Sequence, residues 1–238
     1  MAFIIDCGMG TTMGVCCMAR VVRVWDLPTR VFHWALFACF IGLLTTAQIG
    51  GDAMAWHFRF GLAVLSLLLF RLIWGMVGGY WSRFSTFFYS PAAVIRYFKG
   101  QRPPEHSIGH NPLGAGSVFA MLGFLLLQVS TGLISDDEIA TAGPFAKFVS
   151  SALVSQATSY HADIGKIILV GLALLHVGAI AFYYFFKGEN LVRPMILGDQ
   201  ETTVATQDSR DDVASRAVAL TVFLGCAALV TWLVRLAS

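Results

Sequence analysis

The stretch HADIGKIILVGLALLHVGA (161–179) decides the fold. Twenty uncharged residues separate Lys166 from Lys187, and a helix needs roughly 20 apolar residues to cross a bilayer core of about 30 Å. The same stretch holds two histidines, His161 and His176. Ionisable side chains are costly within a membrane, so we expect both histidines to have a function.

Four other runs of the chain have the same apolar character. No charged residue interrupts VFHWALFACFIGLLTTAQIGG (31–51), and Arg71 is the only charged residue between Arg59 and Arg83. The runs 107–135 and 217–234 contain no Asp, Glu, Lys or Arg. The sequence therefore predicts five transmembrane helices, at about 31–50, 57–79, 113–134, 161–186 and 216–235.

The composition supports a membrane protein and excludes several other classes. Of the 238 residues, 57% are hydrophobic and 13% are charged, against roughly 45–50% and about 25% in soluble domains. So apolar a chain is neither a disordered protein nor a coiled coil, and no nucleic-acid partner is expected. The five cysteines show neither CxxC nor CxxCH spacing, so thiol chemistry, zinc binding and c-type haem attachment are not expected.

We expect an all-α integral membrane fold, in which residues 22–197 form a four-helix bundle and residues 216–238 add a fifth, C-terminal membrane helix. Residues 1–21 are predicted to be a cytoplasmic tail, and residues 198–215 a polar linker. Short cytoplasmic segments are rich in Lys and Arg, and one side would hold 11 of the 16 basic residues. These are Arg20, Arg23, Arg30, Arg83, Arg96, Lys99, Arg102, Lys187, Arg193, Arg210 and Arg216. The N-terminus is therefore predicted to be cytoplasmic and the C-terminus periplasmic.

Four histidines fall inside the predicted helices at depths that match in pairs. His33 opens the first helix near the cytoplasmic side, whereas His57 and His161 open the second and fourth helices near the outer side. His176 lies about 22 Å deeper than His161, at about 1.5 Å per residue, and on the same helix face. The depths pair His57 with His161 and His33 with His176. Two facing histidines in a bundle core can hold both axial positions of a haem iron, so two such pairs predict two stacked haems.

Other residues fit this hypothesis. Gly61 and Gly165 each follow a histidine by four residues, where a flat porphyrin needs room, although glycine also lets helices approach closely. Arg71 shares the face of His57 at the depth of the inner pair, where a haem propionate and snorkelling to the cytoplasmic surface are equal alternatives. His106 and His110 have no partner at equal depth and are left out of the ligand set.

Five segments resemble the bacterial cytochrome b-561 and nickel-hydrogenase cytochrome b family. They are WDLPTRVFHW (25–34), HFRFGLAVLSLLLFRLIWG (57–75), GHNPLGA (109–115), HADIGKIILVGLALLHVGA (161–179) and NLVRPMI (190–196). The resemblance implies a four-helix, di-haem b-type cytochrome of the inner membrane that exchanges electrons with quinone and a redox partner. It places the haem ligands at His33, His57, His161 and His176 and matches a family arginine to Arg71.

Three functional hypotheses follow. The first is an electron carrier between the quinone pool and a soluble or periplasmic partner such as a c-type cytochrome, which includes a membrane anchor subunit of a hydrogenase-like complex. The second is a stand-alone quinone oxidoreductase acting on a small redox substrate such as superoxide. The third is a transporter or metal channel that uses the same histidines without haem.

Overall fold

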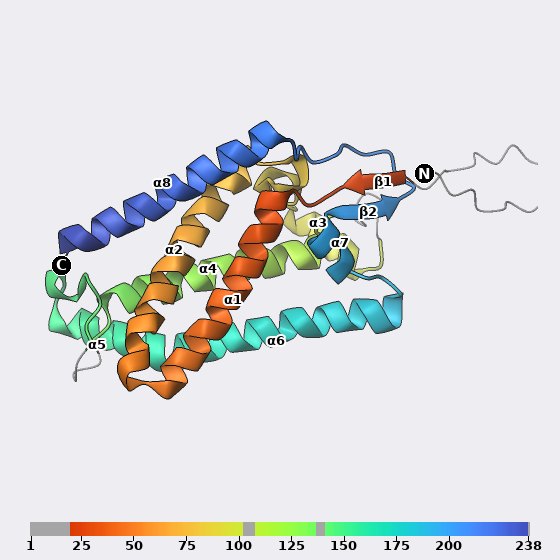
Figure 1. The fold of residues 1–238 in the computed structure, drawn as a ribbon. Coiled ribbons are helices and arrows are strands. Elements are labelled where there is room, and N and C mark those ends of the chain that lie inside the picture. Colours follow the sequence, from red (N-terminus) through yellow and green to blue (C-terminus); the bar gives the residue numbers. More distant parts are fainter. Residues whose placement is uncertain (1–19, 102–107, 137–140, 238) are drawn as a thin grey trace, which may run out of the picture.

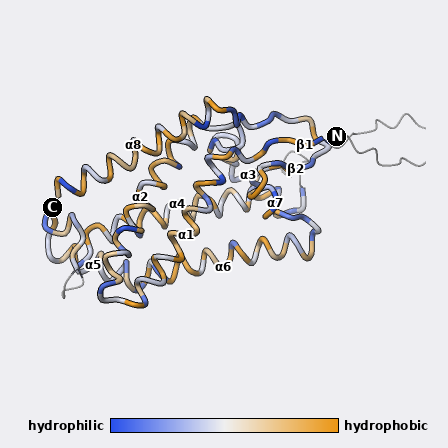
Figure 2. Tube along the Cα trace, in the orientation of Figure 1, coloured by the Kyte–Doolittle hydropathy of each residue, from blue (hydrophilic) through white to orange (hydrophobic). Residues whose placement is uncertain are grey.

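The chain folds as an all-α membrane bundle, seen in a computed structural model that describes residues 20–101, 108–136 and 141–237 (Figure 1). Five helical segments are long and apolar enough to cross a membrane, and hydrophobic residues predominate along them (Figure 2). Their bounds are Leu27–Ile49, Gly51–Val77, Pro112–Ile134, Ser151–Lys187 and Val213–Ala237. The predicted fold class and number of spans are confirmed.

The first two spans form a tightly packed antiparallel pair. Helix α1 (Leu27–Ile49) and helix α2 (Met54–Val77) are joined by a single 3-10 turn, Gly51–Ala53. Gly50 and Gly51 adopt φ angles of 67° and 52° in this reversal, which glycine reaches without a steric penalty. Where α1 begins and α2 ends, the bundle carries most of its basic residues, and we call this the basic end.

The remaining spans complete the bundle. Helix α4 (Pro112–Ile134) runs beside the fourth span, which comprises α5 (Ser151–Ser159), a π-helical segment (Tyr160–Gly165), α6 (Lys166–Phe182) and a second π-helical segment (Tyr183–Lys187). Helix α8 (Val213–Ala237) packs mainly along α2 and ends near α5, at the end opposite to the basic end (Figure 1). A short helix, α3 (Pro91–Phe98), connects the second and third spans at the basic end.

The helices start earlier in the structure than predicted, with α2 at Met54 instead of 57 and α8 at Val213 instead of 216. Helix α1 begins at Leu27 instead of 31, because the Asp26 side chain caps it by accepting a hydrogen bond from Thr29 N at 2.8 Å. The fourth span begins at Ser151 instead of 161. His161 therefore lies inside a helical segment and does not open it.

The segment predicted as a polar linker is an ordered part of the basic end. Strand β2 (Asp199–Thr202), preceded by helix α7 (Val192–Leu197), pairs antiparallel with strand β1 (Arg20–Arg23). Further along, Asp211 forms ion pairs with Arg23 at 2.8 Å and with Arg216 at 2.9 Å. Burial alone would raise the pKa of Asp211, but hydrogen bonds from Arg216 and Leu27 N and the charges of both arginines lower it overall. Of the predicted tail 1–21, residues 1–19 lie outside the described residues.

A buried carboxylate holds the basic end together. Asp26 is fully buried, and its Oδ2 accepts hydrogen bonds from Ser82 Oγ at 2.7 Å, Trp74 Nε1 at 3.1 Å and Gly79 N at 3.1 Å. A side chain at Gly79 would place its Cβ 2.5 Å from this oxygen, so only glycine fits there. Asp26 thereby connects the start of α1 to the end of α2 and to the loop that follows it.

We predict that Asp26→Ala lowers the free energy of unfolding by about 3 kcal/mol or more, because it leaves several buried donors without an acceptor. The measurement is chemical unfolding in detergent micelles followed by circular dichroism. Asp52→Asn is the matched control, because Asp52 is exposed in the turn before α2, and it should change the stability by less than about 0.5 kcal/mol. Equal effects of the two substitutions would refute the role given to Asp26.

Candidate functional site

The structure brings the four membrane histidines together in two pairs. His57 on α2 faces His161 in the π-helical segment, with ring centroids 6.1 Å apart. His33 on α1 faces His176 on α6, with ring centroids 6.4 Å apart. The first pair lies toward the end opposite to the basic end, and the second lies toward the basic end. These are the pairs expected from helix depth, and we call them the distal pair and the basic-end pair.

Both separations suit a metal ion held between two imidazoles. Two rings that bind opposite sides of one ion, with bonds of about 2.0 Å, have centroids roughly 6 Å apart. No hydrogen bond joins the two rings of either pair, and neither pair is stacked: the interplanar angles are 84° for the distal pair and 52° for the other. The two rings of each pair therefore do not bind each other.

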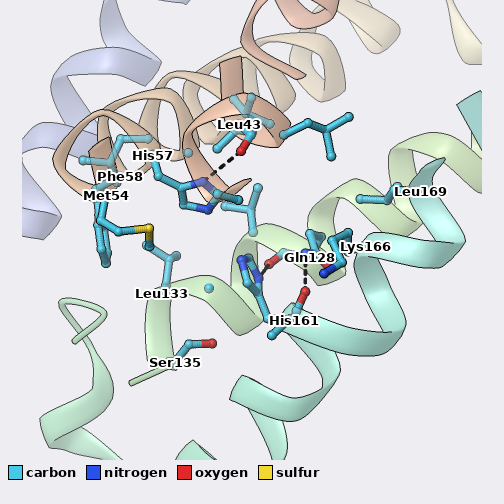
Figure 3. Close-up of a pocket in the computed structure, with 18 of the residues that line it drawn as sticks. Leu43, Met54, His57, Phe58, Gln128, Leu133, Ser135, His161, Lys166 and Leu169 are labelled. Atoms are coloured by element: carbon cyan, nitrogen blue, oxygen red, sulfur yellow. Dashed lines mark hydrogen bonds between the residues drawn. The ribbon is translucent and has the colours of Figure 1, made fainter. Parts of the chain in front are cut away.

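In the distal pair, backbone carbonyls fix which ring nitrogen is free. His57 Nδ1 lies 3.1 Å from Leu43 O of α1, and His161 Nδ1 lies 2.8 Å from Gln128 O of α4 (Figure 3). A carbonyl oxygen only accepts hydrogen bonds, so each Nδ1 must carry the hydrogen. The lone pair of each ring is then on Nε2, where it is available to a metal.

A cavity of about 330 Å³ surrounds the distal pair. Its wall is mostly apolar, and Figure 3 shows His57 and His161 on opposite sides of it. The lining includes Leu43, Met54, Phe58, Leu133 and Leu169, together with Gln128, Ser135 and Lys166. An apolar cavity with a few polar groups is typical of a cofactor site.

The glycines near the distal pair have different roles. Gly61 lines the cavity, and a Cβ added there would meet nothing within 4 Å, so it leaves open space as the predicted groove requires. Gly165 is buried against the Gln128 side chain and is not among the lining residues, so it serves helix contact. The sequence prediction missed Gly132, where a Cβ would lie 2.7 Å from His161 Cε1. Gly132 makes the room that the His161 ring occupies.

The basic-end pair has different surroundings. His33 Nδ1 is buried and has no hydrogen-bond partner. Arg71 is only 3% exposed, donates a hydrogen bond to Ser82 O at 3.0 Å, and places its guanidinium 4.6 Å from the centre of the Phe84 ring. Arg71 therefore faces the bundle interior and does not snorkel to the surface.

His110, which the sequence left without a partner, lies near the basic-end pair. It packs against Trp25 and Phe87, with ring centroids 4.7 Å and 4.6 Å away. Burial, with the charges of Arg71, His176 and His33, lowers its pKa to about 3. The sequence does hold one signal for His110. It directly precedes Asn111, the N-cap of α4, and therefore lies at the start of a membrane span. His106 lies outside the described residues.

The ligand count favours a cofactor that brings its own donors. Within residues 20–101, 108–136 and 141–237, no group of three or more His, Cys, Asp or Glu side chains could hold a metal ion. Protein sites for a bare transition metal usually supply three or four ligands, whereas each pair here supplies two. A porphyrin would complete such a site, because it would bring four nitrogen donors of its own to an iron held by the two imidazoles.

Comparisons with known proteins agree with this chemistry. The sequence model of the prokaryotic cytochrome b561 family matches residues 24–198. A probable Ni/Fe-hydrogenase B-type cytochrome subunit of Bradyrhizobium diazoefficiens is 23% identical over 218 residues, covering 76% of this chain and 86% of that protein. The equivalent protein of Rhizobium leguminosarum bv. viciae is also 23% identical over 218 residues, covering 75% and 88%. A probable Ni/Fe-hydrogenase 1 B-type cytochrome subunit of Escherichia coli K12 is 25% identical over 153 residues, covering 52% and 64%.

The family match covers well over half of the chain and includes all four paired histidines. Two facing pairs of imidazoles within a bundle of membrane spans agree with this family. The chain belongs to the prokaryotic cytochrome b561 family and is a b-type cytochrome of a membrane.

Proposed function

We propose that the protein holds two haem b groups, one between His57 and His161 and one between His33 and His176, and transfers electrons through them. The observation that carries this proposal is the spacing of the two imidazole pairs. Their ring centroids are 6.1 Å and 6.4 Å apart, which suits two imidazoles that bind one iron from opposite sides. The free Nε2 atoms of the distal pair and the apolar cavity around it support the same assignment.

Haem iron supplies one-electron chemistry, so no side chain here needs to make or break a bond in a substrate. The residues of the chain orient the ligands and control their surroundings. The carbonyls of Leu43 and Gln128 hold the distal imidazoles in one tautomer, and apolar side chains exclude water. At the basic end, the buried Arg71 guanidinium is the cation that would face a haem carboxylate.

We further propose the membrane setting of this transfer. The two pairs lie toward opposite ends of the bundle, so together they connect the two faces of the membrane. The excess of Lys and Arg supports a cytoplasmic basic end in a bacterial inner membrane, with the N-terminus cytoplasmic and the C-terminus periplasmic. Electrons would pass between the quinone pool and a redox partner, either a c-type cytochrome or a catalytic subunit.

The names of the relatives favour a catalytic subunit as this partner, because they are described as cytochrome subunits of Ni/Fe hydrogenases. The alternative is a stand-alone quinone oxidoreductase for a small substrate such as superoxide. We predict that the tagged chain, purified from its native membrane in mild detergent, retains a second redox protein. Recovery of the cytochrome alone, with quinone reduction by the isolated chain, would favour the alternative.

Histidine substitutions test the haem assignment. We predict that wild-type membranes show a b-type reduced-minus-oxidised spectrum with two haems per chain. His57→Ala and His33→Ala should each remove one haem, because each leaves one pair with a single ligand. Haem is quantified by the pyridine haemochrome assay against protein concentration. His110→Ala is the control and should keep both haems, since His110 belongs to neither pair.

Two results would contradict the assignment. Absence of a b-type spectrum in the wild-type membranes would remove both haem hypotheses and favour a transporter or metal channel. Retention of two haems in both His57→Ala and His33→Ala would show that other residues bind the iron.

The open space at Gly61 supports a separate prediction. Gly61→Leu should reduce haem occupancy of the distal pair, because its side chain would project into the cavity that Gly61 lines. Haem content should fall from two toward one per chain, while the helical circular dichroism signal stays unchanged. Gly171→Leu is the matched control on α6, where a Cβ also meets nothing within 4 Å and which does not line this cavity. Equal haem content in the two variants would count against a haem beside Gly61.

A further inference from the structure

Lys166 is a cation that lines the distal cavity and forms no ion pair with any described residue. It is the first residue of α6 and belongs to the same membrane span as His161. Figure 3 shows it among the cavity-lining side chains. Among the described residues, no carboxylate lies within ion-pair distance of Lys166, and no hydrogen bond to its Nζ is formed. Within the part of the chain that the structure describes, the ammonium group is therefore without an ion-pair partner.

The depth of Lys166 makes this charge unusual. His57 lies three residues inside the start of α2, and Lys166 lies five residues beyond His161, which faces His57. At about 1.5 Å per residue, Lys166 is roughly 12 Å from the level where α2 begins. A cation at such a depth in a membrane helix is costly and normally marks a functional position.

The π-helical segment places Lys166 on the side of the cavity. In a regular α-helix, a residue five positions after His161 would be turned about 140° away from it. In the segment Tyr160–Gly165 each turn is wider, since its hydrogen bonds join residues five apart, and Lys166 returns to the face of His161. The local backbone thus directs both an imidazole and an ammonium group toward one cavity.

The Gln128 side chain, which also lines the cavity, does not accept a hydrogen bond from Lys166. Gln128 donates its Nε2 hydrogen to His161 O at 2.9 Å, and its Oε1 is buried without a partner. At the basic end, by contrast, a cation and a carboxylate share one partner, since Arg71 donates a hydrogen bond to Ser82 O and Ser82 Oγ donates one to Asp26. Asp136 also lines the distal cavity but forms no ion pair with Lys166, so among the described residues the Lys166 ammonium is an unpaired positive charge beside the distal pair.

We propose that Lys166 raises the reduction potential of the haem bound between His57 and His161. This proposal rests on the proposed haem site. Reduction adds one electron to the iron without a bond or a proton changing hands, and a nearby positive charge stabilises the form that has gained the electron. The effect is strong because a charge interaction is weakly screened within an apolar cavity. Lys166 is thus a residue that tunes the distal site and does not bind the metal.

Potentiometric titration of the purified cytochrome tests this role. The absorbance of the reduced haems is recorded against applied potential in wild type, Lys166→Met and Lys166→Arg, with His57→Ala used to assign the distal component. In Lys166→Met, the ratio of reduced to oxidised distal haem at fixed potential should fall about tenfold, a shift of about 59 mV for one electron. Lys166→Arg keeps the charge and should restore a potential near that of wild type.

Lys147→Met is the matched control, because it removes an exposed lysine from the loop before α5 and should leave both potentials unchanged. If Lys166→Met does not accumulate in the membrane, Lys166→Gln carries the same measurement. Two haems with unchanged distal potential in the uncharged variant would overturn the proposal while leaving the haem site intact. An equal shift in Lys166→Arg would also overturn it, since charge would not be the cause. Absence of haem from the wild type would instead refute the proposed function.

Discussion

The hydrogen bonds to the buried carboxylate of Asp26 are the constraint on which the rest of the bundle depends. Its two oxygens cap α1 and hold the end of α2 and the following loop in one arrangement. At the far end of the same helix pair, His57 is bonded to Leu43 O of α1. The register of α1 against α2 is thus fixed at both ends by polar contacts in otherwise apolar surroundings. This register sets the depths of His33 and His57, and with them the depths of both candidate sites.

Polar groups in the membrane interior orient the histidine rings as much as they stabilise the fold. The carbonyl oxygens of Leu43 and Gln128 select the tautomer of the distal imidazoles, and Gly132 gives one ring its space. The basic-end pair lacks equivalent support at His33, whose Nδ1 is buried without a partner. The two sites are therefore not copies of each other, although both have similar ring separations. Such a difference in surroundings is the means by which a protein gives two identical cofactors different electron affinities.

The sequence predicted the features that depend on length, rise and charge. Five spans follow from uncharged runs, and the pairing of His57 with His161 follows from residue counts along straight helices. It did not predict features that depend on contacts between helices. Nothing in the spacing of Gly165 shows that it packs against Gln128, or that Gly132 is the glycine that accommodates a ligand ring. The order within 198–215 was also missed, because its polar composition does not reveal the pairing of β2 with β1.

The wide turn at Tyr160–Gly165 also bears on how this helix tolerates changes in length. A π-helical turn accommodates one more residue than an α-helical turn, so the extra residue is absorbed locally instead of rotating everything beyond it. A chain one residue shorter at this point would form regular α-helix and would still direct His161 and His176 to one side, about 40° apart. Deletion of a single residue is thus permitted here, whereas the same deletion midway along α6 would turn the second imidazole out of the bundle.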